Sequence, residues 1–302
     1  LLRTLYWETE VVLSGGHSAI DHKQRVAQAR EELRHALPKW SDLDFEAYAA
    51  RLPQAYWLRA TLEQKLLHAK LLNMTEVEIL APITDILVDR DRSVTGLTVI
   101  APDHPRLLST LAGACAATGA NIVDAQVFTT ADGMALDTIF VSRAFRFDDD
   151  ELRRAGSIVL AIERALSGQV RLRDMVAART RAAGENRDVF RIHPEVSIDN
   201  TLSNRFTVVE VTGLDRPGLL YELTAIISRL SLNIASAHIA TFGEKAADVF
   251  YVTDLMGEKI TSPHRQEAIR LAILGVFDPA KKASVVADSG FRHLLGIAIL
   301  PD

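Results

Sequence analysis

An internal repeat restricts the fold of this chain more than any other feature of its sequence. Residues 97–130 and 209–242 align without gaps at a spacing of 112, the distance from Asp103 to Asp215. Self-similarity over such a length predicts one supersecondary unit that occurs twice. Ten of the 34 aligned positions are identical, and in the first copy these are Val99, Asp103, Pro105, Leu107, Leu108, Leu111, Asn121, Ile122, Ala125 and Thr129.

Each copy has the same predicted order: a strand, an acid–x–proline turn, a helix, a hairpin and a second helix. The spacing drops to 111 after the hairpin tip, so that Asp137 aligns with Asp248. This βαββα order lacks one strand of the ferredoxin-like plan. Residues 196–198 are the candidate strand for the first copy, and 285–287 or 297–300 for the second. The other elements are expected at 95–100 and 206–211, 105–118 and 217–230, 121–145 and 233–255, and about 150–167 and 263–276.

The first 75 residues have a helical pattern that differs from the repeated part. Ser41 with Asp44, and Thr61 with Gln64, have the spacing of helix-capping pairs. We therefore predict an α+β protein with two tandem βαββαβ ferredoxin-like domains behind a helical segment. The predicted boundaries are 1–75 for the helical segment, 76–200 for the first domain with an arginine-rich connector, 201–278 for the second domain and 279–302 for an unassigned tail.

Composition argues against several classes of protein. The 302 residues suit two or three domains, and the net charge of −5 gives no reason to expect nucleic acid or an anionic membrane as a partner. No apolar run approaches the ~20 residues of a membrane helix. Cys115 is the only cysteine, which fits a reducing, cytoplasmic setting, and its small neighbours predict a buried helix position.

The turn before each first helix has the residues of a candidate ligand site. Pro105 and Pro217 suit the first turn of a helix, and the acids before them, Asp103 and Asp215, are predicted to cap it. Gly218 has no such explanation, because glycine inside a helix costs about 1 kcal/mol relative to alanine. Without a side chain there, an anion can approach the amides of the helix N-terminus.

Asn233 opens the next strand and is predicted to lie beside this turn, where its amide can bind both a carboxylate and an ammonium group. An acid, exposed amides and an amide side chain together suit a zwitterion. In the first copy Arg106 replaces Gly218 and would crowd the site, so the second copy is favoured. The predicted ligand-binding residues are Asp215, Arg216, Pro217, Gly218, Leu219, Asn233 and Ile234, with Asp103, His104, Pro105 and Asn121 in the first copy.

These motifs resemble a known family. DRPGLL, followed by a helix and then by NI at the start of a strand, resembles the ACT domain, a βαββαβ module that binds amino acids at interfaces. The string DAQVFTTADGMALDT together with residues 203–252 resembles the tandem ACT region of the bifunctional enzymes that uridylylate and deuridylylate the PII nitrogen-signalling protein. The similarity covers residues 90–275 well, and the helical start resembles the end of the HD-type hydrolase domain of these enzymes.

The resemblance implies a regulatory, glutamine-sensing part of such an enzyme. In the family, one active site transfers uridylyl groups from UTP to PII and a metal-bound HD centre removes them. The implied partners are glutamine or another free amino acid, PII, and a second ACT domain within the chain or in another chain. Mg²⁺ is implied for the parent enzyme, whereas the chain has no His-Asp dipeptide, and we predict no catalytic residue, metal ligand or cofactor within it.

Three alternatives stay open. A stand-alone tandem-ACT regulator that binds amino acids is one, although a start inside a helical pattern without Met suggests a piece of a longer protein. An enzyme that holds Mg²⁺ on SDLD, residues 41–44, is another, but a helix cap fits this motif better. For His17 and His22, a solvated helix start fits better than a metal site. The arginines of the connector form either a solvated helix face or a surface that docks catalytic domains or PII.

Overall fold

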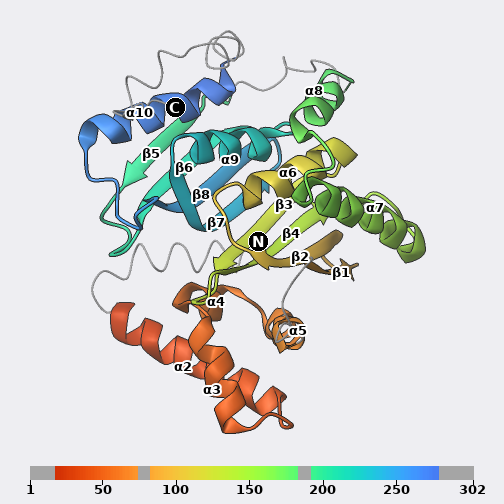
Figure 1. Ribbon diagram of the computed structural model, residues 1–302, viewed down its shortest axis with the longest axis vertical. Coiled ribbons are helices and arrows are strands. Elements are labelled where there is room, and N and C mark those ends of the chain that lie inside the picture. Colours follow the sequence, from red (N-terminus) through yellow and green to blue (C-terminus); the bar gives the residue numbers. More distant parts are fainter. Residues whose placement is uncertain (1–17, 74–81, 183–191, 279–302) are drawn as a thin grey trace. The chain divides into compact units, whose positions relative to one another are not determined.

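The structure, a computed structural model, describes residues 18–73, 82–182 and 192–278 (Figure 1). The chain forms two compact units, of which the first holds the helical segment with the hairpin tip Phe128–Met134 and the second holds the remainder of both repeats. The second unit combines helices with a sheet, as the predicted α+β class requires. The expected tail strands, 285–287 and 297–300, lie outside the described residues.

The helices of the first unit begin at the predicted caps. Ser41 Oγ accepts a hydrogen bond from Asp44 N at 3.2 Å. Thr61 Oγ1 accepts from Gln64 N at 3.2 Å, and Gln64 Oε1 accepts from Thr61 N at 2.8 Å, which is a reciprocal capping box. Both predictions are therefore confirmed. The described helices are α2 (Ser18–Ala36), α3 (Asp42–Arg51), α4 (Gln54–Arg59) and α5 (Leu62–Asn73).

Tyr56 lies at the centre of the first unit and is fully buried. Its ring meets Phe128 of the hairpin tip edge to face, with centroids 5.4 Å apart, and its hydroxyl lies 3.3 Å from His68 Nδ1. Burial lowers the pKa of His68 to about 4, so the imidazole is neutral at pH 7. Arg51 Nη2 donates to Asp132 Oδ2 of the same tip at 2.9 Å. Aromatic packing and an ion pair thus hold the tip segment on these helices.

A single eight-stranded sheet runs through both repeats in the order β1-β2-β4-β3-β7-β8-β6-β5. Each repeat contributes four strands, and β3 and β7 are neighbours where the repeats meet. Buried positions alternate with more exposed ones along β8 and the second half of β6, whereas β2 and β4 are buried along most of their length. The strands are β1 (Ile83–Asp89), β2 (Val94–Pro102), β3 (Ile122–Thr129), β4 (Met134–Ser142), β5 (Glu195–Asp199), β6 (Thr207–Leu214), β7 (Leu232–Phe242) and β8 (Lys245–Asp254).

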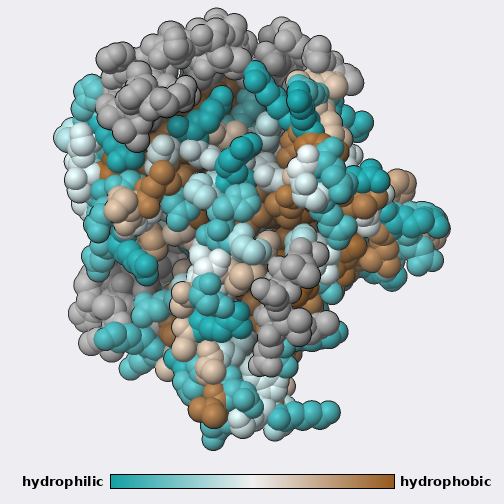
Figure 2. Space-filling model, in the orientation of Figure 1, coloured by the Kyte–Doolittle hydropathy of each residue, from teal (hydrophilic) through white to brown (hydrophobic). Residues whose placement is uncertain are grey.

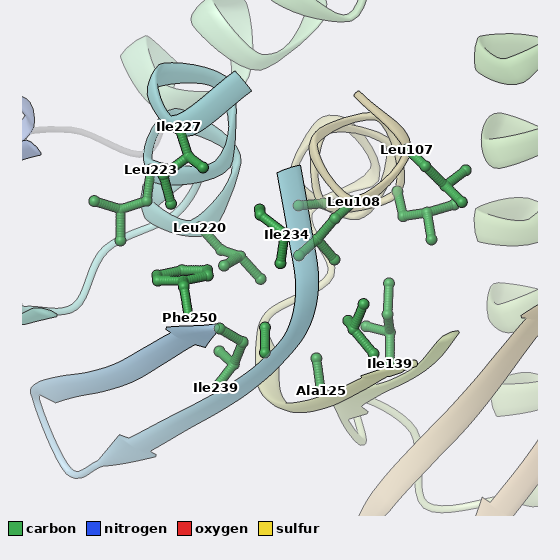
Figure 3. Close-up of a cluster of buried hydrophobic side chains, with 14 of the residues drawn as sticks. Leu107, Leu108, Ala125, Ile139, Leu220, Leu223, Ile227, Ile234, Ile239 and Phe250 are labelled. Carbon is green, nitrogen blue, oxygen red and sulfur yellow. The ribbon is translucent and has the colours of Figure 1, made fainter. Parts of the chain in front are cut away.

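Helices α6 and α9 follow the two turns and pack against each other over the strands (Figure 3). Figure 3 shows the core between helices and strands, with Leu107 and Leu108 from α6 and Leu220, Leu223 and Ile227 from α9. These side chains belong to one buried cluster that spans both repeats. The helices of this unit are α6 (Leu107–Thr118), α7 (Asp148–Leu166), α8 (Leu172–Ala182), α9 (Leu219–Arg229), α10 (Pro263–Leu274) and the 3₁₀ turn η2 (Gly275–Phe277).

The fourth strand of each repeat precedes the repeat instead of following it. Strand β1 pairs antiparallel with β2, with Ile83 opposite Ile100. Strand β5 pairs antiparallel with β6, with Val196 opposite Val211. The expectation that residues 196–198 complete the first repeat is therefore wrong. Strand β5 is connected to β6 by a few residues, and neighbours in sequence pair more readily than distant segments.

The helix-facing side chains expected from the repeat are buried. Cys115 is fully buried, as predicted, and burial raises the pKa of its thiol to about 12. Gly113 on α6 lets α9 come close, because a Cβ there would lie 2.9 Å from Cδ2 of Tyr221 and 3.0 Å from Cδ1 of Leu172. Close approach of the helices thus depends on a residue without a side chain.

The face shown in Figure 2 is largely hydrophilic, with hydrophobic residues between the polar ones. Leu152 and Leu160 on α7 keep 43% and 45% of their surface exposed. Isolated exposed apolar side chains of this kind are ordinary on soluble proteins. None of the described helices combines the length and the apolar character that crossing a membrane requires.

Glu151 is a fully buried carboxylate that joins α7 to β2 and to the loop before α7. It accepts hydrogen bonds from Thr95 Oγ1 at 2.9 Å, from the amides of Ala144 and Phe145 at 3.0 Å, and from Arg154 Nη1 at 2.7 Å. Burial by itself raises the pKa of Glu151, but these donors outweigh it and lower the pKa below its usual value. The carboxylate is thus charged and fully bonded in the folded state.

We expect Glu151→Ala to lower the free energy of unfolding by about 3–5 kcal/mol, because it leaves a guanidinium and buried amides without their partner. Asp149→Ala is the matched control, since Asp149 lies exposed in the same first turn of α7 and shares the helix-dipole effect. Its effect should stay within about 1 kcal/mol. Urea unfolding of both variants measures the difference, and equal losses would contradict a special role for Glu151.

Candidate functional site

The turn before α9 is a type II β-turn. Arg216 O accepts a hydrogen bond from Leu219 N at 3.0 Å across Pro217 and Gly218. Gly218 has φ 82° and ψ 3°, the left-handed conformation that this turn type requires at its third residue. The glycine that the helix-capping argument left unexplained therefore has a backbone reason, because other residues rarely adopt this φ.

The equivalent turn before α6 is type I. His104 O accepts from Leu107 N at 2.9 Å, and Arg106 has φ −104° and ψ 0°. An arginine fits this conformation without strain. The prolines, Pro105 and Pro217, occupy the second position of each turn. The prediction that they start the helices is wrong by two residues, since the helices begin at the leucines that close the turns.

The acids in these turns do not cap the helices, which corrects a second expectation. Neither α6 nor α9 has a side-chain cap. Asp215 Oδ1 instead accepts from Arg216 N at 2.8 Å, and Oδ2 accepts from Thr241 Oγ1 at 3.1 Å. In the first repeat, Arg106 N donates to His104 Nδ1 at 3.3 Å. The side chain of Asp215 thus ties the turn to the end of β7 and stays below the helix N-terminus.

Arg216 places a guanidinium beside the turn. Its Nη1 and Nη2 atoms donate to Glu222 Oε1 at 3.2 Å and Oε2 at 2.6 Å. Nη2 also donates to the carbonyl oxygen of Val276 in η2 at 3.0 Å. Such a forked pair is a strong, directional arrangement. The carboxylate of Asp215 and the guanidinium of Arg216 therefore lie on neighbouring residues where this turn begins.

Asn233 and Ile234 do not join the turn of their own repeat. Asn233 pairs with Thr253 at one end of the β7–β8 hairpin, whereas Thr241, which contacts the turn, pairs with Ala246 at the other end. Eight residues of strand separate Asn233 from Thr241, which is about 26 Å. The expectation that the strand opening lies beside the turn is therefore wrong.

The remaining predicted positions have other surroundings. Ile234 is a core residue beside Leu108 and Leu220 (Figure 3). Asn121 precedes β3 with an exposed side chain, and its carbonyl accepts from Ser142 N at 2.9 Å. The structure thus brings Asp215 together with the turn of Arg216, Pro217, Gly218 and Leu219, and Asp103 together with the turn that holds His104 and Pro105, but leaves the two asparagines apart from them.

Asp248 is a second acid beneath the α9 turn. It is 3% exposed and lies on β8 opposite Val211, on the same covered face as Phe250. Burial, then repulsion from Asp215, raises the pKa of Asp248 to about 8, although a hydrogen bond from the backbone of Ala240 opposes this. Burial also raises the pKa of Asp215 against hydrogen bonds from Thr241 and Arg216 N. The site therefore combines two carboxyl groups that burial disposes to hold protons.

The site argument from sequence missed Asp248, Thr241, Glu222 and η2. Asp248 had a signal, because an aspartate recurs inside an apolar strand at Asp137, which is 1% exposed. A carboxyl group repeated among buried positions indicates an equivalent place in the core of both copies. The contacts of Glu222 and η2 have no local signal, since they depend on how α9 and α10 pack.

The candidate metal ligands of the sequence have other roles in the described residues. They contain no group of three or more His, Cys, Asp or Glu side chains able to hold a metal ion. In SDLD, Asp42 pairs with Arg34 at 2.7 Å and Asp44 accepts from Ser41 Oγ at 2.6 Å. The motif is a helix start, as the cap interpretation predicts. His17 and the side chain of His22 lie outside the described part.

Two protein-family profiles match the repeats. The profile of the ACT domain matches residues 95–155, and that of the ACR family N-terminal ACT domain matches residues 202–276. Both repeats are therefore ACT domains, and the predicted tandem ferredoxin-like fold is confirmed.

Curated relatives share most of this sequence. The bifunctional uridylyltransferase/uridylyl-removing enzymes of Nitrobacter winogradskyi, Nitrobacter hamburgensis and Rhodopseudomonas palustris are 53%, 54% and 52% identical over 274, 275 and 275 residues. Each alignment covers 91% of this chain and 29–30% of the relative, so the chain spans less than a third of their length. A solved structure, of an unknown protein from Galdieria sulphuraria, aligns with 61% of this chain and 91% of its own chain. The sequence identity is 16% and the TM-score is 0.20.

The buried acid predicts a pH-dependent stability. Because the folded-state pKa of Asp248 is about 8 against an ordinary 3.8, the folded state holds more protons between these values. The free energy of unfolding should then fall as pH rises through this window, by up to about 1.4 kcal/mol per pH unit. Asp215 shifts in the same direction and adds to the slope.

We expect Asp248→Asn to flatten this slope, measured as urea midpoints from about pH 5 to about pH 8. Glu210→Gln is the control, because Glu210 lies exposed on the neighbouring strand β6. An unchanged slope in Asp248→Asn would show that the carboxyl is ionised throughout this range.

Proposed function

Because this chain belongs to the family of the bifunctional uridylyltransferase/uridylyl-removing enzymes and carries two ACT domains, we propose that it is the regulatory part of such an enzyme and binds free glutamine. The turn before α9 is the proposed site. The parent enzyme would transfer uridylyl groups from UTP to PII and remove them again. Mg²⁺, implied for that transfer, is assigned to no residue of this chain.

The observation that carries the proposal is the pairing of opposite charges in one turn. Arg216 offers a guanidinium for a carboxylate, and Asp215, which accepts only two described hydrogen bonds, offers oxygens for an ammonium group. An α-helix also leaves its first amides without intrahelical partners, and these favour an anion. A free amino acid carries an ammonium and a carboxylate on the same α-carbon, so opposite charges on neighbouring residues suit it.

The expected affinity suits a metabolite sensor. A hydrogen bond to a charged group contributes about 1.5–3 kcal/mol, and a few of them minus the ordering costs place a small ligand between about millimolar and micromolar. The ligand must also compete with Glu222 and Val276 for Arg216, which keeps the affinity moderate.

We assign the stronger site to the second repeat. The type I turn of the first repeat places Arg106 where the second has Gly218, and His104 where it has Arg216. Asn121 immediately precedes β3, and Asn233 is the second residue of β7. Because these strands are neighbours in the sheet, we assign the two asparagines to the boundary between the ACT domains.

The shared sheet suggests how binding acts at a distance. Side chains from both repeats form one buried cluster, so a shift of α9 changes the packing of α6. Binding energy that differs between two arrangements shifts their populations. A stand-alone amino-acid regulator is the less favoured alternative, since identity above 50% extends over 91% of the chain.

We expect titration calorimetry to detect glutamine binding to the 302-residue chain. Asp215→Asn should weaken binding on the order of tenfold, because it removes a charge-assisted hydrogen bond. Asp103→Asn is the matched control at the equivalent position of the first repeat and should leave the tighter site unchanged. Lack of heat with glutamine in every protein would contradict the proposal, and a loss confined to Asp103→Asn would move the site to the first repeat.

A further inference from the structure

The 3₁₀ turn η2, which follows α10, covers the proposed ligand turn. Val276 is 9% exposed, and its carbonyl oxygen accepts from Arg216 Nη2 at 3.0 Å. Phe277 is half-buried and packs against the core cluster. The carbonyl oxygen of Val276 thus contacts Arg216, and the phenyl ring of Phe277 lies against Gly213.

The ring of Phe277 occupies space that exists because position 213 is glycine. A Cβ added to Gly213 would overlap Cε1 of Phe277 and lie 2.8 Å from its Cζ. Gly213 is buried on β6, two residues before Asp215, and its backbone φ needs no glycine. The absent side chain is therefore explained by the ring that lies over it.

The first repeat provides an internal comparison. Ala101 stands at the position equivalent to Gly213 and is 5% exposed. It carries a methyl group where the second repeat has only a hydrogen atom. The described chain after α7 continues into Ser167 and Gly168 without a 3₁₀ turn, so the covering segment belongs to the second repeat.

We propose that the place of Phe277 over Gly213 is an apolar subsite of the amino-acid site, which the chain itself fills in this structure. A free amino acid binds the turn by displacing η2. Its carboxylate replaces the Val276 carbonyl on Arg216, and the carbon chain of its side group replaces the phenyl ring. This inference rests on the proposed function and adds a competing, intramolecular occupant to it.

The competition makes η2 a regulatory element. If the open form is a minor fraction of the population, the apparent dissociation constant rises by the inverse of that fraction. Linkage requires that a ligand favouring the open form releases η2, and that release of η2 strengthens binding by the same factor. The end of α10 would then report the state of the site to whatever follows it.

Calorimetric titration of glutamine into the 302-residue chain tests the inference with two variants. Phe277→Ala should lower the dissociation constant on the order of tenfold, because the competing occupant is gone. Leu271→Ala is the control, since Leu271 is 53% exposed on α10 and a similar truncation there should change nothing. Equal or weaker binding by Phe277→Ala would overturn the inference while the proposed function stands, whereas absence of binding in every protein would overturn both.

Hydrogen exchange tests the same point without a substitution. The amide of Asp278 donates to Gly275 O at 3.3 Å and reports on η2. Saturating glutamine should speed deuterium uptake in residues 275–278, because the displaced segment loses this bond. Uptake that is unchanged or slower on binding would show that η2 stays in place and would overturn the inference.

Discussion

The adjacency of β3 and β7 is the constraint on which the second unit depends. It joins two four-stranded repeats into one sheet and removes two strand edges that would otherwise be exposed. It also sets α6 beside α9, where Gly113 lets the ring of Tyr221 approach. One buried cluster results, with side chains from both ACT domains. A local change in one domain can therefore reach the other across the shared core.

Duplication produced two turns with the same hydrogen bond and different backbone shapes. The His104–Leu107 turn is type I and the Arg216–Leu219 turn is type II, which reverses the central peptide. A single residue, glycine in place of arginine, permits this difference. A second glycine at the end of β6 makes room for a phenyl ring where the other repeat has a methyl group. Divergence at two positions thus separates a scaffold from a candidate site.

The polar groups of the site are arranged around buried carboxyls. Asp215 ties the turn to β7 through Thr241, and Asp248 lies below on the covered face of β8. Burial raises the pKa of both, so a cation that enters the site meets groups whose charge depends on their neighbours. In contrast, Glu151 in the first repeat is bonded by four donors and kept charged. A buried carboxyl group thus has a structural role in the first repeat, whereas the raised pKa values in the second repeat allow its carboxyl groups to change protonation.

The sequence by itself determined the repeated unit, the helix faces and the caps at Ser41 and Thr61, because these follow from local spacing and propensity. The ACT identity of both domains came from the resemblance of their motifs to that family. It did not determine the fourth strand of each repeat, since the pattern of residues 195–199 indicates a strand but does not say whether it pairs with the strand before it or with β6 after it. It misplaced Asn233. The start of β7 was expected beside the turn before α9, but the turn contacts Thr241 near the other end of that strand. Only the tertiary structure decided that Asp248 lies under the turn and that Phe277 covers it, since both contacts join segments that carry no sequence signal for each other.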